Sequence, residues 1–301
     1  MEVLDKMYQK ILVALDGSEL AERAIHYAET IAMRVGGEII VFSVFEREIY
    51  EENLMKVYLE KKAEELRERG LKATVAIGYG EAADGIVDYS EKNDIDLIVM
   101  CTHGRSGITR WVTGSISSKV IQESYTPLLL IKTGVMQTEF LAEELCKILV
   151  PLDGSKYSEA ALPYATDIAN KVNCELILLR VNNATELSSY LDPEFIPGWE
   201  LYLAQAMPDI LEGIQNYLVE AKKRLQAEGF SVRSESAFGR AGEEIIKYAE
   251  SHDINLIVMT THGRSGFSHW AYGSVAYKLI HGTSKPILLV RPRPSILNSN
   301  T

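Results

Sequence analysis

The apolar residues of this chain follow two alternating spacings. Residues 11–15 form an uninterrupted apolar run, which is typical of a strand buried on both faces of a parallel sheet. From Leu20 to Ala32 apolar residues recur every three or four positions, which predicts an amphipathic helix capped by Ser18 and ended by Gly36. Further strands are expected at 38–44, 73–77, 97–100 and 128–131, with helices at 51–69, 82–92 and 115–123. This strict alternation predicts a doubly wound parallel α/β sheet.

The same pattern occurs twice. Residues 10–44 return as residues 147–181 with 18 identities in 35 positions, and residues 95–131 return as residues 254–290 with 19 in 37. The period exceeds 130 residues, so each copy is a domain, with predicted bounds of 1–138 and 139–301. We therefore expect two tandem doubly wound five-stranded sheets. The offsets differ by 22 residues, and this extra chain is expected within 182–206, where residues 192–198 have the composition of a loop.

Composition and charge exclude several classes of function. The 301 residues include 31 Lys and Arg against 42 Asp and Glu, a net charge of −11, which disfavours nucleic acid and anionic membranes as partners. The three cysteines, Cys101, Cys146 and Cys174, contain no Cys-x-x-Cys pair, so neither a disulfide framework nor a structural zinc is expected. The first residues lack the order of a secretory signal and the apolar runs are short, so we expect a cytoplasmic protein.

Polar residues follow the first strand of each copy, where ligands of doubly wound sheets bind. Asp16-Gly-Ser and Asp153-Gly-Ser occupy these positions. We interpret the serines as helix caps. For the aspartates two readings stay open. One is a turn or cap, and the other, which we favour, is a ligand contact to a ribose, a base or a cation.

A second shared segment follows the fourth strand of each copy. Both copies contain Thr-His-Gly-Arg-Ser-Gly and then a Gly-Ser pair at the start of a helix. Glycine allows close backbone approach, and a helix start presents free N–H groups and a positive dipole end. Arg105 and Arg264 could add charge-assisted hydrogen bonds. This combination favours an anion-binding loop over a flexible connector.

These segments resemble the universal stress protein family, once per half and over nearly the whole chain. Its nucleotide-binding members carry a phosphate loop spaced Gly-x2-Gly-x9-Gly-Ser/Thr. The matching residues are Gly104, Gly114 and Ser115 in the first copy and Gly263, Gly273 and Ser274 in the second, while Cys101 and Thr260 stand at the first glycine. The resemblance further implies ligand roles for Asp16 and Asp153, adenine contacts at Val44 and Val181, and a phosphate donor at Ser117, which Ala276 replaces in the second copy.

The resemblance implies a stress-response protein that binds adenine nucleotide, ATP or AMP, with Mg²⁺ accompanying ATP. Hydrolysis should be slow or absent, because the sequence offers no convincing general base or metal cluster. The alternative is a scaffold or interaction protein that binds no nucleotide, and a third class, an adenylating enzyme, lacks its motifs. Because Ala276 provides no hydroxyl at the position of Ser117, we expect the first site to bind ATP more tightly than the second. Family members pair through the last strand of the sheet, so residues 128–131 and 287–290 are expected to pair within the chain, and a further homodimer stays open.

Overall fold

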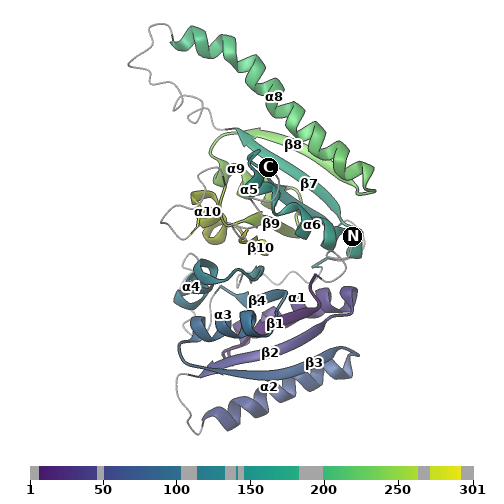
Figure 1. Ribbon diagram of the computed structural model, residues 1–301, viewed down its shortest axis with the longest axis vertical. Coiled ribbons are helices and arrows are strands. Elements are labelled where there is room, and N and C mark those ends of the chain that lie inside the picture. Colours follow the sequence, from purple (N-terminus) through teal and green to yellow (C-terminus); the bar gives the residue numbers. More distant parts are fainter. Residues whose placement is uncertain are drawn as a thin grey trace.

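The computed structural model describes residues 7–45, 51–102, 114–132, 140–141, 146–182, 199–263 and 272–292. Strands and helices alternate through the first half (Figure 1). They are β1 Lys10–Ala14, α1 Glu19–Val35, β2 Glu38–Phe45, α2 Glu51–Glu68, β3 Lys72–Tyr79, α3 Ala82–Lys92, β4 Leu97–Cys101, α4 Ser115–Glu123 and β5 Leu128–Ile131. All nine lie within two residues of their predicted ranges, because buried runs and caps mark them strongly.

The second half repeats this order with two changes. Its elements are β6 Lys147–Pro151, α5 Lys156–Glu159, α6 Leu162–Val172, β7 Glu175–Asn182, α8 Trp199–Ala227, β8 Val232–Phe238, α9 Ala241–Ser251, β9 Leu256–Thr260, α10 Ser274–Gly282 and β10 Ile287–Val290. The counterpart of α1 is divided into α5 and α6, because Pro163 in the first turn of α6 has no N–H group for an upstream carbonyl. Helix α8 has 29 residues against 18 in α2, so part of the extra chain is helical.

The ten strands form one sheet in the order β3-β2-β1-β4-β5-β10-β9-β6-β7-β8. Neighbouring strands are parallel, except that β5 and β10 pair antiparallel, with Leu129 opposite Leu288. The expected pairing of the last strands within the chain is therefore confirmed, and the two five-stranded sheets are continuous (Figure 1). Two strands that would each leave a row of unpaired backbone groups thus cover one another.

Apolar side chains fill the space on both faces of this sheet. Ile11 and Val13 of β1 belong to the layer under α1 and α2, whereas Leu12 belongs to the opposite layer under α3 and α4. All three are fully buried, and burial of such a side chain contributes about 1.5–3 kcal/mol. The carboxyl ends of the strands are thereby held on a rigid support. No helix within the described part of the chain is long and apolar enough to cross a membrane.

The expectation of no disulfide is wrong. Cys146 and Cys174 form a disulfide with a Cα–Cα distance of 4.6 Å, and both are buried. Each cysteine lies one residue before a neighbouring strand, and Lys147 and Glu175 are paired in register. The fold brings the two cysteines together across 28 residues of sequence, a separation that motif spacing does not detect.

Candidate functional site

The strand order reverses between β1 and β4 in the first half and between β6 and β9 in the second. Ligands of open α/β sheets bind beyond the carboxyl ends of the strands at such a point. The register of β1 with β2 brings Asp16 and Val44 level with each other at this edge. Asp153 and Val181 occupy the same positions in the second half. The predicted aspartates and valines are therefore brought together in both halves.

The turn after β1 is organised by its aspartate. Gly17 has a φ of +83°, which favours glycine, and lets the chain reverse between Asp16 and Ser18. The backbone N–H and the hydroxyl of Ser18 donate to Asp16 Oδ1 at 3.0 and 2.6 Å. The Ser18 hydroxyl in turn accepts the N–H of Ala21, so the predicted cap is confirmed. The same carboxylate that faces the crevice thus holds the start of α1 in place.

In the second half the turn contacts the loop after β9 directly. Ser155 N–H donates to Asp153 Oδ1 at 2.9 Å, and the Ser155 side chain caps α5. A Cβ atom on residue 263 would lie 2.5 Å from Asp153 Oδ2, so a side chain there would require the Asp153 carboxylate to move. This close approach explains the second glycine of the loop pattern, and it brings Asp153 and the loop to one crevice.

Cys101 and Thr260, at the position of the first glycine, both use their side chains in hydrogen bonds within the protein. Cys101 Sγ donates to the Leu20 carbonyl at 2.9 Å, and Thr260 Oγ1 donates to the His262 carbonyl at 2.7 Å. Both residues are buried. Burial raises the pKa of the Cys101 thiol to about 12, so this thiol stays protonated near neutral pH and is no nucleophile.

The residue that ends each loop hydrogen-bonds to the residue that follows the preceding strand. Gly114 N–H donates to the Thr102 carbonyl at 2.8 Å, and Gly273 N–H donates to the Thr261 carbonyl at the same distance. A Cβ atom on residue 114 would lie 3.2 Å from the Thr102 oxygen, which is a tight contact. Glycine at position 114 therefore lets the first loop close at its base, whereas a Cβ atom on residue 273 would lie 3.4 Å from the Thr261 oxygen, an ordinary contact.

Helices α4 and α10 begin at these glycines. Gly114 and Gly273 have extended backbones and supply no side-chain cap, and the next residues, Ser115 and Ser274, are exposed. The first N–H groups of such a helix, together with its dipole, form a site for an anion. Among the described residues no cluster of three or more His, Cys, Asp or Glu side chains could hold a metal ion. The chemistry offered is hydrogen bonding to an anion.

The universal stress protein family model matches residues 7–132 and 145–291. The chain belongs to the universal stress protein family. Universal stress protein Slr1230 of Synechocystis is 23% identical and covers 94% of this chain and all of its own length. Universal stress protein MJ0577 of Methanocaldococcus jannaschii is 29% identical over 50% of this chain and 96% of its own. A crystal structure of a universal stress protein from Archaeoglobus fulgidus covers 94% of this chain with a TM-score of 0.68 at 21% identity, so the tandem fold is shared.

In this universal stress protein Ser117 points into the base of the loop. Its hydroxyl is directed at the carbonyl oxygens of Thr102 and Gly114, at 3.1 and 3.0 Å, and the residue is 2% exposed. A contact from this hydroxyl to a phosphate would require these hydrogen bonds to break. The buried Ala276 takes the same place in the second half. Ser117 therefore connects α4 to the residue after β4, a structural role that a serine at this position did not indicate from the sequence.

Arg180 is a site residue that sequence reasoning missed. A Cβ atom on Gly154 would lie 2.6 Å from Arg180 Nη1, so the guanidinium covers the turn after β6. It also lies 5.3 Å from the centre of the Tyr217 ring. The first half has the buried Ser43 at the matching position. Comparison of the two copies position by position would have shown this added cation in the second crevice.

Three of the predicted site residues, Gly104, Arg105 and Arg264, lie outside the described residues.

Proposed function

We propose that this universal stress protein binds adenine nucleotide, one molecule in each half. The proposal rests on one observation above all: the uncapped start of α4 or α10 lies at the same sheet edge as an Asp-Gly-Ser turn. The helix start suits the phosphates, the aspartate at 16 or 153 suits a ribose hydroxyl, and the strand end at Val44 or Val181 suits the adenine.

ATP and AMP both fit this proposal. Mg²⁺ would accompany the phosphates of ATP. The chain's own residues would bind and orient the nucleotide. We expect slow hydrolysis at most, since Cys101 is protonated and inward-facing and Ser117 is buried.

Equilibrium titration of purified protein with ATP tests the proposal. The wild-type chain should bind two molecules of ATP. Gly114→Val and Gly273→Val should each lose one, because a branched side chain would stand at the start of the helix that takes the phosphates, and at residue 114 it would also crowd the Thr102 carbonyl oxygen. Gly213→Val, at an exposed position of α8 with open space around it, is the control and should keep both sites. Thermal unfolding of each variant checks that the fold is intact.

If ATP and AMP both fail to bind to the folded wild-type chain, nucleotide binding is excluded, and the scaffold alternative takes its place. If either loop variant keeps two sites, the assignment of the phosphates to α4 and α10 is wrong.

A further inference from the structure

The two outer strands of the sheet, β3 and β8, differ in character although they are copies of one another. Residues 74–78 of β3 read Thr-Val-Ala-Ile-Gly, whereas the matching residues 233–237 of β8 read Arg-Ser-Glu-Ser-Ala. Arg233 forms a bidentate ion pair with Glu175 at 2.7 and 2.6 Å. Charged side chains protect an outer strand from pairing with another chain, and β3 carries none after Lys72 at its start. The first half therefore presents an edge that can accept a further strand.

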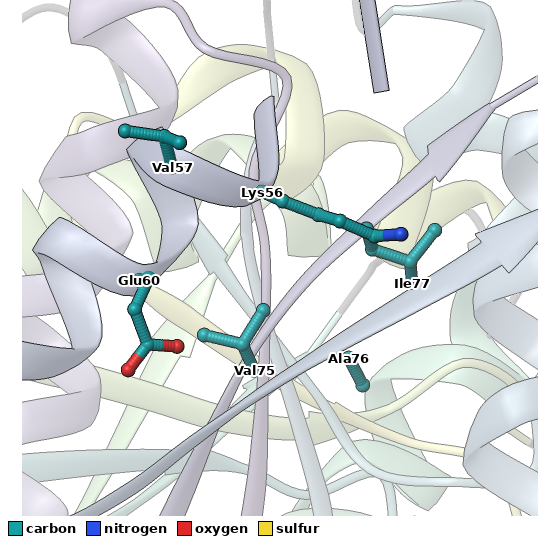
Figure 2. Close-up of a pocket in the computed structure, with 6 residues that line it drawn as sticks. All are labelled: Lys56, Val57, Glu60, Val75, Ala76 and Ile77. Carbon is teal, nitrogen blue, oxygen red and sulfur yellow. The ribbon is translucent and has the colours of Figure 1, made fainter. Parts of the chain in front are cut away.

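A groove follows this edge on the side of α2. Its volume is about 470 Å³, and its lining residues are Lys56, Val57, Glu60, Val75, Ala76 and Ile77. Figure 2 shows Lys56 reaching over β3 beside Ile77, and Glu60 beside Val75. On the outer side of α2, Val57 is 70% exposed and Leu54 is 67% exposed. Apolar side chains and an open strand edge thus share one surface.

In β3 the backbone N–H and C=O groups that do not bond to β2 belong to the apolar residues Val75 and Ile77. Gly80 N–H donates to the Phe45 carbonyl of β2. Backbone groups of successive strand residues point to opposite edges, so the even-numbered residues of β3 bond to β2. The N–H and C=O groups of Val75 and Ile77 therefore point outward, along the groove.

We propose that this surface binds a second copy of the chain, with the two β3 strands antiparallel about a two-fold axis at Ala76. This register pairs Val75 of each copy with Ile77 of the other, in the hydrogen-bonded positions. It also places Lys56, which lies beside Ile77, next to the partner copy's Glu60, which lies beside Val75. The surface is self-complementary in charge and in strand register, as a two-fold interface must be.

The ion pairs of the single chain do not oppose this arrangement. Lys56 pairs with Glu52, and Glu60 pairs with Arg67 at 2.6 Å. The side chains of Lys56 and Glu60 are more than half exposed, and an exposed ion pair is worth about 0–1 kcal/mol, so the exchange of partners across the interface costs little. Strand β8 of a second copy fits less well, because its outward residues Ser234 and Ser236 would lie against the apolar pair of β3 and Glu235 would lie against Ala76.

Disulfide trapping tests the register. In the proposed dimer, residue 76 of one copy lies opposite residue 76 of the other in a non-hydrogen-bonded pair. The Cα atoms of such a pair are about 4.5 Å apart, which is within the range of a disulfide. Ala76→Cys should give a covalent dimer of the full chain under mild oxidation. Glu235→Cys, the matched position of β8, is the control and should form no covalent dimer. A folded A76C chain that does not crosslink, or equal crosslinking of both variants, overturns the proposal.

Sedimentation velocity tests the surface without a new cysteine. The wild-type chain should show a reversible dimer between about 1 µM and about 1 mM, the range of weak association. Val75→Lys should weaken it at least about tenfold, whereas Ser234→Lys at the matched position of β8 should not. K56E alone should weaken the dimer, and the K56E/E60K double variant should restore it. A wild-type chain that stays monomeric throughout, or a dimer unaffected by Val75→Lys, overturns the proposal, and circular dichroism confirms that each variant folds.

Discussion

At the scale of single residues, Ser117 shows how one hydroxyl can serve either a ligand or the fold. Its hydrogen bonds to Thr102 and Gly114 lie inside the protein, so Ser117→Ala should lower the free energy of unfolding by about 1 kcal/mol. The expected loss of ATP affinity is less than about tenfold, below the cost of a lost hydrogen bond to a charged phosphate. Urea denaturation and ATP titration measure the two quantities. Unchanged stability together with a large loss of ATP affinity would show that Ser117 contacts the phosphates and does not stabilise the fold.

Lys132 directly follows β5, and burial lowers its pKa to about 8. In the unfolded chain this pKa is about 10.4, so the unfolded state binds more protons between the two values. The free energy of unfolding should therefore rise as the pH rises from about 8 to about 10.4. Lys132→Met removes the buried charge and should stabilise the protein by about 1–3 kcal/mol at pH 7. This difference from the wild type should shrink by pH 10, as urea denaturation at both pH values would show.

Arg291 at the matching position is the control for this prediction. Its guanidinium donates to the Gln122 carbonyl and lies 4.5 Å from the centre of the Tyr125 ring. Arg291→Met should therefore destabilise the protein at both pH values. A pH-independent effect of Lys132→Met would show that its charge is not the cause.

At the scale of elements, the disulfide fastens the starts of β6 and β7 together. Closing a segment of 28 residues restricts the unfolded chain, which should contribute about 3–4 kcal/mol to stability. Reductant should lower the urea midpoint of the wild type to that of the C146S/C174S double variant, which should not respond to reductant. The first half has Gln9 and Gly37 at these positions, so it provides no second disulfide. An equal response of both proteins to reductant would refute this assignment.

Sequence reasoning found the elements but not every contact between them. The strands were predictable because runs such as residues 11–15 are buried on both faces, and the helices because caps and glycines mark their ends. The disulfide and Arg180 were missed because both depend on which strands become neighbours. The inward turn of Cys101 was equally hidden, since a small side chain at a loop can face either way. Pairing of β5 with β10 was predictable, because an unpaired edge needs a cover.

At the scale of the whole molecule, the seam between β5 and β10 makes each half depend on the other. A chain of residues 1–138 would keep β4 on one side of Leu128–Ile131 but leave the other edge of these four buried apolar residues without its partner strand β10. In the Val75→Lys background, which blocks the outer edge, this half should self-associate through β5. Light scattering after gel filtration measures its mass, with the full-length variant as the monomeric reference. A folded, monomeric first half would show that the seam is dispensable.

The antiparallel seam also fixes how the two crevices face the surroundings. Parallel strands of one half all end at the same edge, and across β5 and β10 that direction is inverted. The two crevices therefore open at opposite edges of the sheet. No single compact ligand can bridge them, and a protein docked over one leaves the other accessible. The duplication therefore gives this chain two candidate sites that are reached from opposite sides.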